Sequence, residues 1–310
     1  MISKSSKIFI AGHNGMVGSA IYKKLLNKGY KKIITANKKK LNLIDQKSTF
    51  SFLKKKKPDF VILAAAKVGG ILANNQFKDK FIYENLQIQN NVIHGAHLAS
   101  VKNLFFLGSS CIYPRLCKQP MKEKYLLTGE LEKTNDAYSI AKIAGLKMCE
   151  FYSYVHKVNY KTLMPPNLYG PNDNYDLDNS HFYPALLKKI YIAKKNNKKF
   201  LNIWGTGRAK RELMFVDDFA DAVIYFMKKK INQPYINIGT GKDYSIDWYA
   251  KYLMKKMNVK LKLKHDHSKP DGMPKKCLDI STAKKYGYKP VNNFDNGFDA
   301  TFKFLKNLSN

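Results

Sequence analysis

The segment KIFIAGHNGMVG, residues 7–18, decides the fold. It begins as a short apolar strand, turns at Gly12 and leads into a helix-like stretch over residues 17–28 that ends at Gly29. Its glycines are spaced G-x-x-G-x-x-G, which lets the backbone turn tightly and approach a pyrophosphate at the N-terminus of the following helix. Glycine triads also occur in ordinary turns, but the strand–turn–helix context here indicates a dinucleotide site.

The end of the second predicted strand indicates which dinucleotide is bound. NAD sites usually place Asp or Glu there, where the carboxylate takes the ribose hydroxyls. Here the strand runs into Lys38-Lys39-Lys40 with no acidic residue. Cations at this position favour the 2′-phosphate of NADP(H), unless these lysines belong only to the general lysine excess of the chain.

The rest of the N-terminal half alternates between strand-like and helix-like stretches. Apolar runs at residues 31–36, 59–66 and 103–110 are separated by helical stretches at 45–56 and 82–100. Buried strands separated by amphipathic helices predict an α/β fold, a Rossmann-type doubly wound parallel sheet covered on both faces.

The second half is less regular. Prolines and a polar stretch over residues 165–180 interrupt the pattern, and an apolar run at 235–241 resembles a return to the sheet. We therefore expect residues 1–165 to form an NADP-binding Rossmann domain, with returning segments near 212–240. Residues 166–310 should form mainly a smaller, discontinuous α/β lobe that binds substrate.

Composition excludes several classes of protein. The 310 residues are 45% hydrophobic and 25% charged, as in a folded soluble protein. No apolar run reaches the roughly 18 residues that span a bilayer, and no secretory signal precedes the first strand. The four cysteines show no zinc spacing, so we expect no metal, free thiols and a cytoplasmic location.

The net charge of +32 would ordinarily suggest nucleic acid or an anionic membrane as partner. However, only three of the 55 basic residues are arginine, and the lysines are spread over the whole length. Proteins that read base edges favour the bidentate fork of arginine. We therefore expect neither nucleic acid nor membrane as partner.

Three polar residues form a candidate catalytic group. Tyr138 and Lys142 lie one helical turn apart in YSIAK, and Ser109 follows a predicted core strand at its carboxyl end, where ligands bind in such sheets. We expect the Lys142 ammonium to favour the Tyr138 phenolate by lowering its pKa. A Tyr-x-x-x-Lys pair is common by chance, but the glycine triad and Ser109 make coincidence a poor explanation.

Together these residues resemble the extended branch of the short-chain dehydrogenase/reductase superfamily, which acts on nucleotide sugars. Several further motifs are similar to those of the GDP-L-fucose synthase family and cover residues 7 to about 290. They are AGHNGMVGSAI, AAAKVGGI-ANN, FLGSSCIYP, AYSIAKIAGLKMCE, NLYGP, NSH, PALL, WGTG, VDD, NIGTG and SKPDG.

The resemblance implies a two-stage reaction on GDP-4-keto-6-deoxy-D-mannose. The 4-keto group acidifies the protons on C3 and C5, so that both centres can be inverted, and hydride from NADPH then reduces C4. Cys111 matches the epimerisation base, His181 its acid, and Ser109, Tyr138 and Lys142 the reductase residues. Without the resemblance, Cys111 reads as a small buried hydrophobic residue and His181 as an ordinary loop histidine.

The resemblance also implies binding residues and a homodimer that packs through the Tyr138 helix. The expected cofactor-binding residues are Gly12, His13, Asn14, Gly15, Met16, Val17, Gly18, Lys38, Leu107, Gly108, Ser109, Tyr138, Lys142, Pro165, Asn167, Leu168 and His181. The residues expected to bind the GDP-sugar are Asn167, Lys189, Trp204, Arg211 and Asp271.

The chain departs from the family pattern at four positions. Asn14 stands where many members have arginine, lysines stand at 38 and 189 where arginine is common, and Pro166 replaces a usual threonine. The positive charge survives at two of these places, which leaves the strength of the NADP preference open.

Two other functions remain open at this stage. The protein could be an epimerase or reductase for another GDP-4-keto-sugar, such as a GDP-6-deoxy-heptose. It could also be a nucleotide-sensing or nucleic-acid-binding protein on a dehydrogenase scaffold, against which the intact Ser109, Tyr138 and Lys142 argue.

Overall fold

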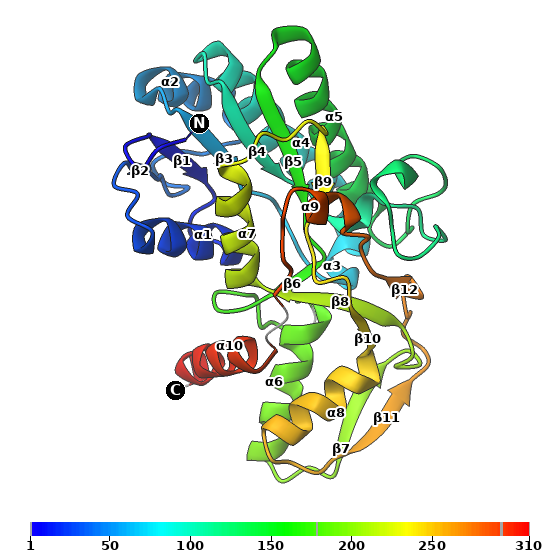
Figure 1. Cartoon of the computed structure of the whole chain (residues 1–310). Helices are drawn as coiled ribbons and strands as arrows, with labels where there is room; N and C mark the ends of the chain where they lie inside the picture. The colour runs from blue at the N-terminus through cyan, green and yellow to red at the C-terminus, as the bar shows by residue number, and fades with distance from the viewer. Residues whose placement is uncertain (1, 178, 292–293, 310) are drawn as a thin grey trace.

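A computed structural model of the chain describes residues 2–177, 179–291 and 294–309. Its larger sheet has six parallel strands in the order β2-β1-β3-β4-β5-β9 (Figure 1). These are β1 (Ile8–Ala11), β2 (Ile33–Ile34), β3 (Phe60–Leu63), β4 (Asn103–Leu107), β5 (Asn159–Met164) and β9 (Tyr235–Asn237). The predicted doubly wound α/β fold is confirmed.

Helices cover both faces of this sheet. One face packs against α1 (Met16–Asn27) and α7 (Val216–Met227), and the short α9 (Ser281–Lys285) lies beside them. The other face packs against α2 (Gln46–Lys56), α4 (Lys78–Leu98) and α5 (Asp136–His156). Successive side chains of β1 enter the two cores in turn, Ile8 and Ile10 on one side and Phe9 and Ala11 on the other. Both faces are therefore buried, which explains the continuous apolar strands.

Three elements differ from their predicted bounds. The helix predicted at 82–100 begins at Lys78, where Asp79 lies favourably in the first turn, and a short helix α3 (Ile71–Gln76) precedes it unpredicted. Strand β2 is only two residues long because it is an edge strand that pairs with β1 alone. Helix α5, for which the sequence indicates a helix up to Glu150 at the end of the motif AYSIAKIAGLKMCE, continues to His156 and stops where Lys157 adopts a left-handed conformation, with φ of 54°.

Smaller sheets form the other part of the molecule, the lower half of Figure 1. One contains β6 (Asn167–Tyr169), β8 (Lys210–Phe215), β10 (Asp243–Ser245) and β12 (Lys275–Lys276), and another pairs β7 (Phe200–Trp204) with β11 (Lys262–Asp266). They share a core with α6 (Phe182–Lys195), α8 (Ile246–Lys256) and α10 (Phe294–Ser309). Two short 3₁₀ helices, η1 (Ser110–Ile112) and η2 (Glu123–Tyr125), follow β4.

The chain passes between the two parts more than once. It leaves the large sheet after β5, returns with α7 and β9, and leaves again at β10. The division at residue 165 stays a prediction, but these crossings place the carboxyl end of the large sheet beside the smaller sheets.

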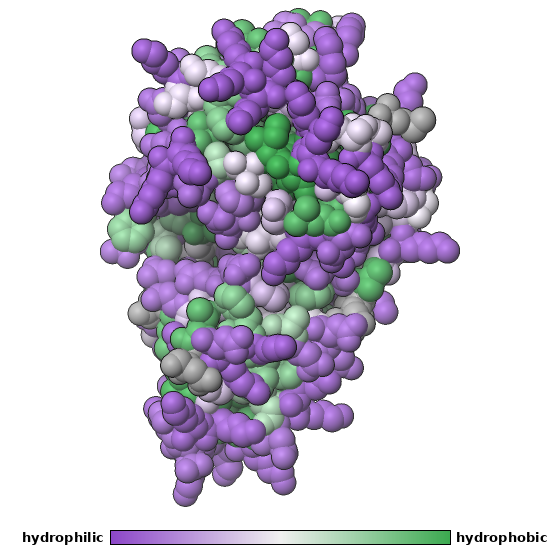
Figure 2. Space-filling view, turned by 90° about the vertical axis from the view of Figure 1, so that its left-hand side faces the viewer, coloured by the Kyte–Doolittle hydropathy of each residue, from purple (hydrophilic) through white to green (hydrophobic). Residues whose placement is uncertain are grey.

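Hydrophilic side chains cover most of the face shown in Figure 2, in its upper and lower parts alike. This agrees with the spread of lysine along the sequence. Among the described residues, no helix is both long and apolar enough to cross a membrane.

Candidate active site

The glycine turn after β1 leaves an open helix N-terminus. Gly12 has φ of +92°, and a Cβ there would lie 2.6 Å from the backbone nitrogen of Ala65. A Cβ on Gly18 would collide with the carbonyl oxygen of Gly12, so α1 can approach the turn this closely only without a side chain there. Gly15 is the N-cap of α1, and no side chain caps the helix. The free N–H groups and the helix dipole therefore suit a pyrophosphate. The other predicted residues of this segment, His13, Asn14, Met16 and Val17, lie in the same turn and first helical turn.

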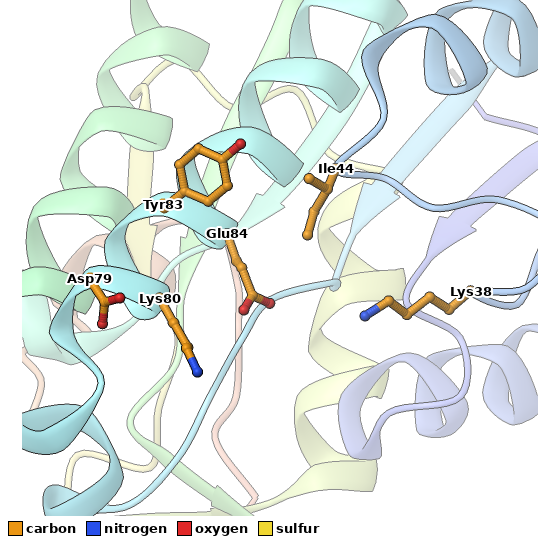
Figure 3. Close-up of a pocket in the computed structure, with 6 residues that line it drawn as sticks. All are labelled: Lys38, Ile44, Asp79, Lys80, Tyr83 and Glu84. Carbon is orange, nitrogen blue, oxygen red and sulfur yellow. The ribbon is translucent and has the colours of Figure 1, made fainter.

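Lys38 lines a hollow of about 560 Å³ between the segment after β2 and helix α4 (Figure 3). Lys80 lines the same hollow, together with Ile44, Asp79, Tyr83 and Glu84. The Glu84 carboxylate forms an ion pair with Lys67, with Nζ and Oε1 2.9 Å apart. Lys67 thus offsets the charge of Glu84, and Lys38 and Lys80 outnumber the other carboxylate of the lining, Asp79, so the hollow suits an anionic group beside Lys38.

The ends of β4 and β5 carry the next group of predicted residues. The Lys142 ammonium nitrogen donates to the carbonyl oxygen of Leu107 at 2.8 Å, and the backbone N–H of Gly108 donates to Leu163 at 2.9 Å. The backbone N–H of Ser110 donates to the carbonyl of Pro165 at 3.1 Å. Asn167 and Leu168 follow on β6. These contacts bring the segments together at the carboxyl edge of the sheet, where ligands bind in such folds.

The pKa of Tyr138 does not shift in the predicted direction. Burial, and second the charge of Cys111, raise the pKa of the Tyr138 phenol well above its ordinary value, and the nearby Ser109 hydroxyl offsets this only in part. Burial lowers the pKa of Lys142 to about 7, and its Nζ lies 5.7 Å from the centroid of the Tyr138 ring. The expectation that Lys142 lowers the pKa of Tyr138 is therefore wrong for this structure, because the influences on that pKa are burial, Cys111 and Ser109, and burial is the largest.

Cys111 is a partly exposed free cysteine held by donors. Lys276 Nζ lies 3.0 Å from its sulfur and Asn135 Nδ2 lies 3.4 Å from it. Burial opposes the charged form, but the Lys276 charge and hydrogen bond, Ser109 and Arg211 outweigh it and lower the pKa of the Cys111 thiol. A thiolate can act as a base at neutral pH.

His181 is the N-cap residue of α6, and the segment before it contacts the loop after β3 through Gly70 N–H and the carbonyl of Asn179, 2.8 Å apart. Desolvation by the surrounding protein and, second, the positive charge of Lys276 lower the pKa of its imidazole to about 4. In the unliganded protein the ring is therefore neutral at pH 7, with one N–H to donate.

The residues predicted to bind the GDP-sugar lie on the smaller sheets and on α6. Lys189 Nζ and Lys269 Nζ lie 5.0 and 5.6 Å from the centroid of the Trp204 ring. Both carboxylate oxygens of Asp271 accept hydrogen bonds from Thr206, one from N–H and one from Oγ, each at 2.8 Å.

The guanidinium of Arg211 donates to backbone carbonyls, those of Lys210, Met273 and Asp271. Arg211 and Asp271 thus fix the segment after β11 in the structure. Their predicted contacts with substrate stay predictions.

Sequence reasoning missed two residues of this site, Lys276 and Asn135. Lys276 reaches Cys111 from 165 positions away, so no local motif contains both. The chain is also rich in lysine, so a lysine at position 276 does not by itself indicate a functional residue. Asn135 precedes α5 and reads as an ordinary helix cap, yet its side chain caps no backbone N–H of that helix.

Comparison with known proteins agrees with this geometry. Residues 8–239 match the NAD dependent epimerase/dehydratase family, and the chain belongs to this family. Within it, the chain is 45% identical to GDP-L-fucose synthase 1 of Arabidopsis thaliana, over 100% of this chain and 96% of the relative. It is 44% identical to GDP-L-fucose synthase of Escherichia coli strain K12, over 97% of both chains. Among solved structures, it is similar to MlghC, a GDP-mannoheptose C4 reductase from Campylobacter jejuni with NADP bound. That match has a TM-score of 0.90 and 36% identity over 99% of this chain and 100% of the other.

Proposed function

We propose that the protein is a bifunctional NADPH-dependent 3,5-epimerase/4-reductase that converts GDP-4-keto-6-deoxy-D-mannose to GDP-L-fucose. The observation that carries the proposal is that one site contains the residues for both epimerisation and reduction. The Cys111 sulfur lies beside the Ser109, Tyr138 and Lys142 group at the carboxyl edge of the sheet. The full-length similarity to two GDP-L-fucose synthases supports the choice of substrate.

NADP(H) fits the glycine turn and the hollow beside Lys38. The uncapped N-terminus of α1 would hold the pyrophosphate, and Lys38 would contact the 2′-phosphate. The NADP-bound state of MlghC supports this choice. When bound, NADPH supplies the hydride that reduces C4. Lys142, fixed to Leu107, would position the nicotinamide ribose.

In the epimerisation stage, Cys111 would act as the base. The thiolate takes a proton from the carbon next to the keto group, and the electron pair of the broken C–H bond passes to the C4 oxygen as an enolate. Ser109 and the neutral Tyr138 phenol would donate hydrogen bonds to that oxygen, because the pKa of Tyr138 is raised. His181 would take up a second proton from water as the negative charge of the enolate develops beside it, and as imidazolium would return a proton to the opposite face of the carbon, which leaves it neutral again.

In the reduction stage, Tyr138 would be the proton donor. Reduction of C4 converts the keto oxygen into an alkoxide that needs a proton. A phenol that stays protonated at neutral pH can supply it, whereas a phenolate cannot. The raised pKa of Tyr138 thus fits the reductive direction of the reaction.

The site beyond the reacting atoms would hold the GDP part of the substrate. The Trp204 ring offers a surface for stacking, and Lys189 and Lys269 beside it offer charge for the diphosphate. Arg211 and Asn167 would complete the contacts, and Asp271 would shape the turn at Thr206 that flanks them.

A matched pair of variants tests the assignment. Cys111→Ser should block the exchange of the C3 and C5 protons with D₂O, because a serine hydroxyl is too weakly acidic to supply the base. Tyr138→Phe should abolish NADPH oxidation but retain exchange, at a lower rate because Ser109 alone then donates to the enolate oxygen. Wild-type exchange in the first variant or wild-type NADPH oxidation in the second would overturn the corresponding role.

A GDP-4-keto-heptose is the second candidate substrate, favoured by the structural similarity to MlghC. The higher identity to the two GDP-L-fucose synthases argues for the 6-deoxy-hexose. NADPH oxidation with each sugar, compared under the same conditions, separates the two: preference for the heptose would overturn the proposed substrate.

We also infer a homodimer and a cytoplasmic location. Helices α4 and α5 pack side by side and expose large apolar side chains to solvent, among them Tyr83, Phe151, Tyr154 and Val155. A second copy of the chain that packs on this face would bury them, as the resemblance implied. The four free cysteines fit the reducing environment of the cytoplasm.

A further inference from the structure

Two side chains outside the predicted catalytic set converge on the Cys111 sulfur, from different parts of the molecule. Asn135 precedes α5 beside the large sheet, and Lys276 lies on β12 in the smaller sheet. Their nitrogens lie 3.4 and 3.0 Å from the sulfur. Both groups are donors, and a thiolate is a much better acceptor than a thiol.

The Asn135 side chain contacts the Cys111 sulfur and does not cap helix α5. Asparagine at an N-cap normally accepts a hydrogen bond from the first turn of the helix, but here it makes no such bond to α5. Its Nδ2 donates to the sulfur instead. Its Oδ1 is buried without a hydrogen-bond partner in the described part of the chain.

Lys276 is held by the strand that carries it. It is 8% exposed, and β12 pairs in register with β8, so that Lys276 lies opposite Arg211. The adjacent Cys277 is fixed on both sides, because its N–H donates to Gln119 and its carbonyl accepts from Met121. The backbone that carries Lys276 is therefore fixed, and its ammonium nitrogen lies 3.0 Å from the Cys111 sulfur. This arrangement indicates a specific contact between the ammonium group and the sulfur.

We propose that Asn135 and Lys276 are positioning residues that hold Cys111 as a thiolate, aimed at the sugar ring, before the substrate arrives. This inference rests on the proposed function, in which Cys111 is the base. The S–H bond that forms during epimerisation removes the negative charge from the sulfur, and the charge moves to the C4 oxygen as the enolate. The two donors therefore stabilise the state of the enzyme that starts the reaction.

Three further charged or titratable groups interact with the sulfur, and a fourth interacts with Lys276 beside it. Arg211 adds positive charge from β8 and supports the thiolate. On α5, the negative charge of the sulfur adds to the raised pKa of Tyr138 and opposes the burial that lowers the pKa of Lys142. His181 senses Lys276. A thiolate that keeps the Tyr138 phenol protonated also keeps the proton needed for the later reduction, so the base of the first stage supports the acid of the second.

The test measures the ionisation of Cys111 directly. Absorbance at 240 nm is titrated with pH in the full-length protein and corrected by the Cys111→Ser variant, and alkylation of Cys111 by neutral iodoacetamide is followed by peptide mass spectrometry. The wild type should titrate below the ordinary cysteine value of about 8.5. Lys276→Met should raise the midpoint by about one pH unit or more, since an opposite charge at this distance has such effects. Asn135→Leu should raise it by less.

Controls are available on the same strand. Lys275 is more exposed and lies 3.7 Å from Asp243, so Lys275→Met should leave the midpoint unchanged, and Lys276→Arg should largely restore it. A wild-type midpoint at or above 8.5, or equal midpoints in the wild type, Lys276→Met and Asn135→Leu, would overturn the proposal. If Lys276→Met fails to fold, the comparison of the Cys111 midpoint in Asn135→Leu and in the wild type tests the proposal. Shifted midpoints with no C3 or C5 exchange in the wild type would instead overturn the proposed function, and would leave only the hold of Asn135 and Lys276 on the Cys111 thiolate.

Discussion

At the scale of single residues, burial determines the chemistry of the site more than neighbouring charges do. Desolvation raises the pKa of the Tyr138 phenol and lowers that of the Lys142 ammonium to about 7. Cys111 is the exception, because the charge and hydrogen bond of Lys276, the Ser109 hydroxyl and Arg211 outweigh the cost of burial and lower its pKa. The neutral phenol and the thiolate are the proton donor and the base that the proposed reaction needs.

Lys142 gives a testable pH dependence of stability. The folded chain releases the Lys142 proton near pH 7, whereas the unfolded chain keeps it up to about pH 10.5. The unfolded state therefore binds one more proton at this site above pH 7, and the contribution of Lys142 to the free energy of unfolding should rise by about 1.4 kcal/mol per pH unit. Chemical denaturation at pH 7, 8 and 9 checks this.

The matched variant for that experiment is Lys142→Met, which keeps the length of the side chain and removes the charge. The rise in stability between pH 7 and 9 should be smaller in the variant than in the wild type. Parallel pH profiles of the two proteins would contradict the depressed pKa of Lys142.

At the scale of elements, the approach of α1 to the turn after β1 builds the cofactor site. The approach depends on Gly18, where any Cβ would meet the carbonyl oxygen of Gly12. Gly18→Ala should cost about 1–3 kcal/mol of stability by overpacking and should weaken NADPH binding, since the N-terminus of α1 moves away from the pyrophosphate. Gly15→Ala is the steric control for stability alone, because a Cβ there has only an ordinary contact of 3.6 Å within the protein but would lie in the predicted cofactor turn.

Denaturation and NADPH fluorescence titration measure the two effects. Equal stability and NADPH affinity in Gly18→Ala and the wild type would show that the close approach is not needed.

Much of the large sheet could be predicted from the sequence, because its signals are local. The glycine turn predicts β1 and α1, and Asp45, which accepts a hydrogen bond from Ser48, predicts the start of α2. The contact between Lys276 and Cys111 could not be predicted, since it joins positions 165 residues apart through two sheets. The upward shift of the Tyr138 pKa could not be predicted either, because burial causes it and burial is a property of the folded chain. Spacing shows only which residues share a helical turn.

At the scale of the whole molecule, the face formed by α4 and α5 carries the proposed dimer contact. Tyr154 on α5 is 75% exposed. Tyr154→Asp should weaken self-association, because it places a charge in an apolar interface. Leu308 on α10 is 61% exposed and lies outside this face, so Leu308→Asp is the matched control. It should leave self-association unchanged.

Light scattering coupled to size exclusion gives the masses. The wild type and Leu308→Asp should have twice the monomer mass of 35.6 kDa, and Tyr154→Asp should shift toward the monomer. A monomeric wild type would contradict the proposed homodimer, and a dimer unaffected by Tyr154→Asp would place the interface elsewhere.

The two parts of the molecule meet at Cys111, and the central claim is that one site performs both epimerisation and reduction. One reaction of the wild type tests it most directly: GDP-4-keto-6-deoxy-D-mannose and NADPH in D₂O, with the product analysed by NMR. The account predicts GDP-L-fucose with deuterium at both C3 and C5. A reduced product that keeps its original protons and configuration at C3 and C5 would contradict it and leave a simple 4-reductase.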